Sequence, residues 1–233
     1  MALPIIQPDA YLFDMDGLLL DSERVFLEHS IALLTPTGRT PADIRAFFLT
    51  LVGSSGAESM RRLSDYLGSK AEAQAFETRW QAAVAAHLSM HAAPKPTVLN
   101  ALQALAGQGG RMAVVTSTHG ARARHHLEVA GLSGFFEKVT GGDEVSANKP
   151  DPAPYLEMAA ALGVDPARCA AFEDSDRGVM SATRAGCHVA QVPDLRPPDV
   201  PLPDLGQYVA QDLWAAVAHL GGTALGLNAV HTR

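Results

Sequence analysis

Short apolar runs alternate with segments of helical periodicity along most of this chain. Each run holds a few apolar residues, often β-branched, and ends at a polar or turn-forming residue, which is typical of strands buried in a parallel sheet. Strands are expected over residues 10–13, 112–116, 138–140, 169–172, 188–192 and 208–211. Helices are expected between them, over residues 98–106, 121–130, 152–162 and 178–185. The alternation predicts an α/β fold, a parallel sheet with helices on both faces.

The segment after the first strand breaks this alternation. Its apolar positions recur at helical spacing, and Thr40-Pro41 has the pattern of a helix N-cap followed by a first-turn proline. Helices are expected over residues 22–34, 41–51, 57–67 and 71–88. They predict a small all-helical domain over residues 19–93, inserted into an α/β domain that comprises residues 1–18 and 94–233.

Composition and charge limit the classes of partner. The 233 residues are 47% hydrophobic and 18% charged, an ordinary balance for a globular protein. The formal net charge is −7 and no basic run occurs, so nucleic acid and anionic membranes are not expected as partners. No apolar stretch approaches the roughly 20 residues of a membrane span, and residues 1–8 lack the features of a secretory signal. We therefore expect a cytoplasmic protein, monomeric but with an oligomer left open.

Two aspartates, Asp14 and Asp16, lie one residue apart where the first apolar run ends, and Gly17 supplies a turn directly after them. Strand alternation would point both carboxylates the same way, at the end of a strand where α/β folds place their sites. One carboxylate can attack a phosphorus centre while the other handles the leaving-group proton. A hard cation such as Mg2+ is needed to let an anionic nucleophile approach an anionic phosphate. The alternative is a pair of turn-forming aspartates.

Three further polar motifs follow in order along the chain. They are Thr116-Ser117-Thr118 after a predicted strand, Lys149 in the turn Asn-Lys-Pro-Asp-Pro, and Glu173-Asp174-Ser175 after another strand. Taken alone, the last motif could simply cap the helix that follows it. As an ordered set, the four motifs resemble those of the haloacid dehalogenase superfamily, over residues 10–193. The segments FDMDGLLLDSE, KPDP and FEDSDRGVMSA are similar to the branch that contains β-phosphoglucomutase and phosphoglycolate phosphatase.

The resemblance implies a Rossmann-like core with a helical cap domain and a phosphoryl-transfer site. It implies that Asp14 is the nucleophile, which forms an aspartyl-phosphate, and that Asp16 protonates the leaving alcohol and then activates water. Thr116 would donate its hydroxyl to the transferring phosphoryl group, and Lys149 would neutralise charge on that group while bridging to Asp14. By the same resemblance, Mg2+ would be held by Asp14, Glu173, Asp174 and the main-chain oxygen of Asp16.

A second group of residues is expected to contact the phosphate or the rest of the substrate. Its members are Gly17, Ser117, Thr118, Glu23 and, in a loop that resembles the family's cap loop, Gly53, Ser54 and Ser55. Gly17 would let the backbone turn tightly beside the phosphate. Ser117 and Thr118 are expected to open a helix, where their backbone N–H groups could hold phosphate oxygens.

The sequence therefore predicts a Mg2+-dependent phosphatase that acts on a small phosphorylated metabolite, a sugar phosphate or similar monoester. The alternative is a phosphomutase of the β-phosphoglucomutase type. In mutase-like relatives an arginine that grips the distal phosphate stands where this chain has Gly56, which argues against the mutase. The third interpretation is a non-catalytic protein that only binds a ligand, and Asp16 argues against it because a binding module needs no acid/base residue.

Overall fold

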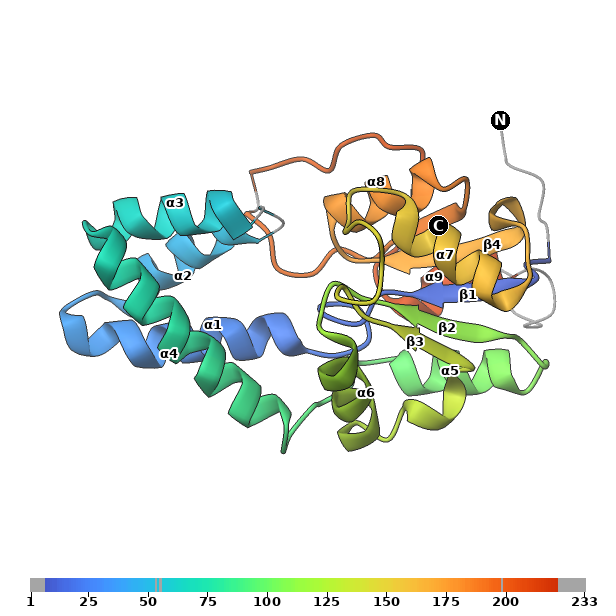
Figure 1. Ribbon diagram of the computed structural model, residues 1–233, viewed down its shortest axis with the longest axis horizontal. Helices are drawn as coiled ribbons and strands as arrows, with labels where there is room; N and C mark the ends of the chain where they lie inside the picture. Colours follow the sequence, from blue (N-terminus) through green and yellow to red (C-terminus); the bar gives the residue numbers. More distant parts are fainter. Residues whose placement is uncertain (1–6, 53, 55, 198, 222–233) are drawn as a thin grey trace, which may run out of the picture.

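A parallel sheet lies at the centre of the computed structural model, which describes residues 7–52, 54, 56–197 and 199–221 (Figure 1). Its strands are β1 (Ala10–Phe13), β2 (Met112–Val115), β3 (Lys138–Thr140), β4 (Cys169–Glu173), β5 (His188–Gln191) and β6 (Tyr208–Val209). Their order is β3-β2-β1-β4-β5-β6, and every neighbouring pair is parallel. The strand order therefore reverses between β1 and β4, the kind of switch point at which open α/β sheets bind ligands.

Helices cover both faces of the sheet, as predicted. One face carries α5 (Val98–Ala106), α6 (Gly120–Val129) and α9 (Leu213–Leu220), and the other carries α7 (Ala153–Leu162) and α8 (Asp176–Arg184). Strand alternation explains this division, because Tyr11 and Phe13 pack with the first group while Ala10 and Leu12 pack with the second. With both faces covered, β1 is apolar and buried at every position.

The structure corrects several predicted boundaries. β2 ends at Val115 and β5 ends at Gln191, one residue earlier than predicted, and β6 is only two residues long. No helix was predicted after residue 211, yet α9 follows β6. It forms because the Asp212 side chain caps it, accepting a hydrogen bond from the Ala215 N–H at 2.8 Å, and because its apolar side packs on the sheet.

A separate helical bundle lies between β1 and α5 in the sequence and at one end of the molecule in Figure 1. Its helices are α1 (Ser22–Leu34), α2 (Pro41–Leu51), α3 (Gly56–Leu67) and α4 (Lys70–Leu88). Their buried apolar side chains form one hydrophobic cluster, distinct from the two clusters of the sheet. Thr40 caps α2 as predicted, since its hydroxyl accepts a hydrogen bond from the Asp43 N–H at 3.2 Å. The fold class is thus confirmed, whereas the domain limits at 18/19 and 93/94 stay predictions.

This helical bundle is called the cap from here on. Two chain segments join the cap to the sheet, and they run side by side. The Asp21 N–H donates to the Ala93 carbonyl oxygen at 3.0 Å, and the Lys95 N–H donates to the Leu19 carbonyl oxygen at 2.9 Å. The pairing gives the cap a two-stranded connection, which lies between the turn at Gly17 and the start of α1 on one side and before α5 on the other.

Within the residues that the structure describes, no helix is long and apolar enough to cross a membrane. The predicted cytoplasmic location, the monomeric state and the lack of nucleic-acid partners stay predictions.

Candidate active site

Acidic side chains gather at the carboxyl edge of the sheet. Asp14 directly follows β1, Glu173 is the last residue of β4, and Asp174 comes next. The strand register brings them together, because Phe13 pairs with Phe172, and these residues directly precede Asp14 and Glu173. Asp14 is 7% exposed and Glu173 is fully buried, which carboxylates rarely are unless they are paired.

A buried lysine links two of these carboxylates. Lys149 Nζ lies 2.5 Å from Asp14 Oδ1 and 2.7 Å from Glu173 Oε1. The same ammonium group donates to the Val115 carbonyl oxygen at 2.8 Å. The Tyr155 hydroxyl donates to Glu173 Oε1 at 2.5 Å. The three ammonium protons of Lys149 thus each have a partner, which holds Lys149 in one position relative to Asp14.

Helix α8 holds the turn that carries this lysine. Arg177 donates to the Lys149 carbonyl oxygen at 2.5 Å, and the Ser181 hydroxyl donates to the Asp151 carbonyl oxygen at 2.5 Å. The N-terminus of α8 is capped by Ser175, whose hydroxyl accepts a hydrogen bond from the Gly178 N–H at 3.2 Å. Because Ser175 does the capping, the side chains of the two acids before it are left for another role.

Burial and the charges of neighbouring groups shift the pKa values of the acids and the lysine in this cluster. Burial raises the pKa of Asp14 to about 8; Lys149 opposes the shift, while Glu173 and Asp16 add to it. Burial, followed by the charges of Asp14 and Glu173, raises the pKa of Asp174 well above its usual range. Burial lowers the pKa of Lys149, but the neighbouring carboxylates outweigh it and the net pKa is raised. The raised pKa values of Asp14 and Asp174 thus reflect burial first and repulsion between neighbouring carboxylates second.

The same cluster fits a divalent cation. Asp14, Glu173 and Asp174 each offer one carboxylate oxygen, and these oxygens all lie within 4.8 Å of one another. Glu173 Oε2 is buried and has no hydrogen-bond partner among the described residues. Carboxylate oxygens are the hard ligands that Mg2+ prefers, and a cation there would offset the repulsion between them. The predicted contribution of the main-chain oxygen of Asp16 stays a prediction.

Two glycines let the backbone approach these carboxylates. Gly17 has φ +76°, which favours glycine, and a Cβ placed there would lie 2.5 Å from Asp174 Oδ2. A Cβ at Gly178 would collide with Glu173 Oε2. Any side chain at either position would displace a carboxylate, so both glycines keep the acidic cluster compact.

Asp16 has a different environment from Asp14. The Thr118 hydroxyl donates to Asp16 Oδ2 at 2.7 Å, and the Thr116 hydroxyl donates to the same oxygen at 3.4 Å. Asp16 is partly exposed, whereas Asp14 is buried against Lys149. One carboxylate is thus held by a cation, and the other is oriented by hydroxyl groups and open to a substrate.

The segment between β2 and α6 differs from the prediction. Helix α6 begins at Gly120, preceded by His119, so Ser117 and Thr118 lie in the turn before the helix and do not open it. The Gly120 N–H donates to Asp143 Oδ1 at 2.7 Å, and this contact sets the helix start. The Thr118 N–H donates to Thr116 Oγ1 at 3.1 Å, whereas Ser117 is exposed.

Three residues of this site were not predicted from the sequence: Tyr155, Lys95 and Asp194. Lys95 Nζ donates to the Gly17 carbonyl oxygen at 2.9 Å and lies 2.5 Å from Asp194 Oδ1. Burial raises the pKa of Asp194, although Lys95 opposes the shift. Asp194 follows the end of β5, so the rule that found the other acids could have found it. No spacing in the sequence signals Lys95 or Tyr155.

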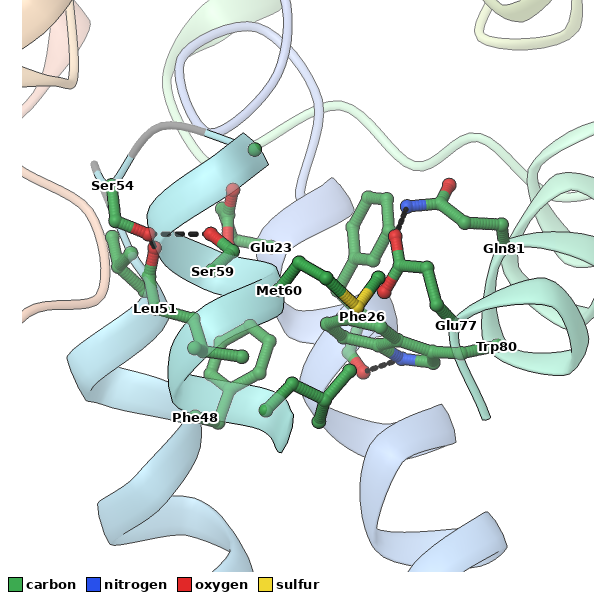
Figure 2. A pocket seen from close by; sticks show the side chains of 13 residues that line it. Glu23, Phe26, Phe48, Leu51, Ser54, Ser59, Met60, Glu77, Trp80 and Gln81 are labelled. Atoms are coloured by element: carbon green, nitrogen blue, oxygen red, sulfur yellow. Dashed lines mark hydrogen bonds between the residues drawn. The ribbon is translucent and has the colours of Figure 1, made fainter. Parts of the chain in front are cut away.

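The predicted cap residues lie beside a pocket of the cap (Figure 2). Glu23 stands in the first turn of α1 and is partly buried. Burial, followed by repulsion from Asp16 and Asp194, raises its pKa to about 7, so Glu23 lies within electrostatic reach of the sheet edge. The Ser54 hydroxyl donates to the Leu51 carbonyl oxygen at 2.7 Å. The other predicted residues of this loop, Gly53 and Ser55, lie outside the described residues.

Comparison with known proteins gives consistent matches. The family described as haloacid dehalogenase-like hydrolase matches residues 11–192. Protein CbbY of Rhodobacter capsulatus is 30% identical over 219 residues, which cover 87% of this chain and 96% of that protein. The phosphorylated carbohydrates phosphatase of Thermotoga maritima is 29% identical over 178 residues, covering 76% of this chain and 82% of that protein. The crystal structure of a HAD family hydrolase from Deinococcus radiodurans R1, with bound phosphate and sodium, has a TM-score of 0.72 and 25% identity, covering 94% and 97% of the two chains.

Proposed function

Because this chain belongs to the haloacid dehalogenase-like hydrolase family, we propose that it is a Mg2+-dependent phosphatase that forms an aspartyl-phosphate intermediate. The observation that carries the proposal is the buried contact of Lys149 with Asp14 and Glu173, beside the acidic cluster at the carboxyl edge of the sheet. We propose a small phosphorylated metabolite as its substrate, a sugar phosphate or similar monoester. The name of the Thermotoga maritima relative supports this substrate class.

Asp14, Glu173 and Asp174, together with the main-chain oxygen of Asp16, would hold Mg2+. When bound, the ion supplies positive charge that lets an anionic nucleophile approach an anionic phosphate.

Asp14 would be the nucleophile. Its carboxylate oxygen attacks phosphorus, the bond from phosphorus to the ester oxygen breaks, and the phosphoryl group is left on Asp14. Lys149 orients the Asp14 carboxylate from 2.5 Å away and places positive charge beside the transferring group. Since phosphoryl transfer needs mainly positioning and charge stabilisation, the rigid contacts of Lys149 serve the reaction directly.

Asp16 would be the acid and then the base. In the first step it gives its proton to the departing alcohol, which would otherwise leave as an unstable alkoxide. The carboxylate formed in this way then takes a proton from the water that attacks the aspartyl-phosphate, releasing inorganic phosphate and Asp14. The hydrogen bond from the Thr118 hydroxyl supports this role by orienting Asp16 while one face of the carboxylate stays accessible.

The alternative function is a phosphomutase, which would return the phosphoryl group to the sugar instead of transferring it to water. A mutase of the β-phosphoglucomutase type must hold a second phosphate in the cap. The described residues that line the cap pocket include neither Arg nor Lys, and Gly56 is one of them. Arg62 of the cap lines the adjoining cavity, where it forms an ion pair with Glu58. This supports hydrolysis over isomerisation.

The test is phosphate release from a panel of sugar, glycolate and nucleoside monophosphates, measured with Mg2+ and with a chelator. We expect release that needs the metal and that is lost in Asp14→Asn, whereas the exposed control Asp199→Asn keeps it. Conversion of glucose 1-phosphate to glucose 6-phosphate without phosphate release would favour the mutase. The proposed phosphatase function would be contradicted if folded, metal-loaded protein hydrolysed no member of the panel.

A further inference from the structure

The helices of the cap line a half-open pocket of about 300 Å3 (Figure 2). Its lining is mixed, because the rings of Phe26, Phe48 and Trp80 lie among polar side chains that include two glutamates, two serines and a glutamine. The described residues that line it include two acids, Glu23 and Glu77, and no basic residue. Ligand pockets begin at about this volume, so the space fits a group about the size of a single ring.

The polar groups of the pocket are positioned to accept hydrogen bonds. The Trp80 Nε1–H is already used, because it donates to the Phe26 carbonyl oxygen at 2.8 Å. Gln81 Nε2 donates to Glu77 Oε1 at 3.0 Å, which orients the Glu77 carboxylate along the pocket wall. Glu23 makes no hydrogen bond within the part of the chain that the structure describes. Two carboxylates with no basic residue among the described lining residues attract hydroxyl and ammonium groups and repel anions.

The pocket is close to the reacting groups in two ways. Glu23 lines it, and the charges of Asp16 and Asp194 both act on Glu23. Val52 lines both this pocket and an adjoining cavity of about 380 Å3, and that second cavity is also lined by Asp174. The cap pocket thus adjoins, through Val52, a cavity that reaches Asp174 of the acidic cluster.

The two arginines near the pocket already form ion pairs with carboxylates. Arg62 and Arg196 line the adjoining cavity. Arg62 Nε lies 2.7 Å from Glu58 Oε1, and Arg196 Nη1 lies 3.2 Å from Asp176 Oδ1. Their charges are thus largely neutralised, and neither residue lines the cap pocket itself.

We propose that the cap pocket binds the leaving group of the substrate, and that this group is an uncharged or cationic alcohol with an apolar ring, not a carboxylate or a second phosphate. The inference rests on the proposed phosphatase function, since it concerns the alcohol released at that site. It makes Glu77 and the aromatic wall determinants of specificity.

Benzyl esters test the charge preference with otherwise matched substrates. We would compare kcat/KM for benzyl phosphate, 4-(aminomethyl)benzyl phosphate and 4-carboxybenzyl phosphate. The carboxylate ester should react at least about tenfold more slowly than the other two, because like charges are forced together in the pocket. Glu77→Gln should narrow this difference, whereas Glu72→Gln, an exposed acid on the same helix, should leave it unchanged.

Two further measurements separate failure of this inference from failure of the phosphatase. Acetyl phosphate has a small leaving group and reports on the sheet-edge site alone. If neither acetyl phosphate nor any benzyl ester is hydrolysed, both proposals fall. If acetyl phosphate is hydrolysed but the carboxylate ester is preferred, the inference alone is overturned, and the cavity with Arg62 and Arg196 would bind the leaving group.

Filling the pocket gives an independent test. Ser59 lines it, and Ser59→Leu adds apolar volume there. We expect kcat/KM for benzyl phosphate to fall at least about tenfold relative to kcat/KM for acetyl phosphate, because overpacking excludes the ring. An unchanged ratio in a folded variant would show that the leaving group binds elsewhere.

Discussion

The sheet-edge site and the cap pocket both contain carboxylates, but Asp14 and Glu173 are buried, whereas Glu23 and Glu77 are only partly buried. At the sheet edge, Asp14 and Glu173 are bound to Lys149 by ion pairs of 2.5 and 2.7 Å. In the cap, Glu23 and Glu77 line the pocket together with aromatic residues, and no basic residue is found among the described residues of the pocket lining. The carboxylates at the sheet edge thus have a cationic partner, whereas those of the cap pocket have none among the described residues that line it.

This difference separates the two tasks of the protein as we propose it. Phosphoryl transfer always presents the same charged group, so a rigid ionic network suits it for any substrate. Recognition of the leaving group needs an environment that differs from one alcohol to another, and apolar walls with a few polar groups provide it. Substitutions at the sheet edge should therefore change the reaction rate and the stability of the protein. Substitutions in the cap pocket should change the selectivity among substrates.

The largest effect is expected from removing the cation of the ionic network. Lys149→Met leaves Asp14 and Glu173 buried and unpaired, which should lower the free energy of unfolding by about 3–5 kcal/mol. Urea denaturation in the presence of a chelator measures this loss. The exposed control Lys138→Met should change stability by less than about 0.5 kcal/mol. Equal stability of the two variants would show that the ionic network is not needed to keep the carboxylates buried.

Asp16→Asn should affect the chemistry in a way that depends on the leaving group. The rate of enzyme phosphorylation by benzyl phosphate should fall about 10^2- to 10^4-fold, because the benzyl alkoxide needs a proton to leave. With acetyl phosphate the same step should fall much less, since acetate leaves without a proton. Rapid-quench measurement of the first turnover separates this step from the later attack of water. An equal fall with both substrates would contradict the role of Asp16 as the acid.

Tyr155→Phe should weaken the network without removing its charge. The Tyr155 hydroxyl donates to Glu173 Oε1 at 2.5 Å, and a buried hydrogen bond to a charged group contributes about 1.5–3 kcal/mol. Thermal and urea unfolding should show a loss of this size. In the exposed control Tyr208→Phe the loss should be close to zero. If the two phenylalanine variants are equally stable, the Tyr155 hydroxyl does not support Glu173.

The smallest effect is expected in the cap. Thr40→Ala removes the N-cap of α2 and should cost about 1 kcal/mol. Thr78→Ala, at an exposed position inside α4, should be neutral or slightly stabilising because alanine has the higher helix propensity. Amide hydrogen exchange should locate the Thr40→Ala effect in α2 and leave β1 unchanged. Equal loss of protection in both regions would contradict the independence of cap and sheet.

The elements that the sequence predicted best are those whose pattern is local. The run before Asp14 is four apolar residues long and ends in a charge, so β1 has the predicted bounds of residues 10–13. Thr40 and Pro41 likewise mark the start of α2 at the predicted residue. Helix α9 was missed because it is only eight residues long, although Asp212 before an apolar run carries the capping signal.

Contacts between distant residues could not be read from the sequence. Lys95 and Asp194 are 99 positions apart, and their contact depends on how the cap connection packs against the loop after β5. The link from Tyr155 to Glu173 joins a helix to a strand. The cap pocket depends on the packing of four helices, so a predicted helix pattern gives its walls but not its volume.

Identifying the residue that carries the phosphoryl group would test the central claim most directly. Protein with Mg2+ would be mixed with acetyl phosphate and quenched in acid during the first turnover, and its peptides would be analysed by mass spectrometry. We expect the peptide containing Asp14 to gain the mass of one phosphoryl group, and the same peptide of Asp14→Asn to gain none. Turnover with the phosphoryl group on another residue, or with no phosphorylated peptide at any quench time, would contradict it.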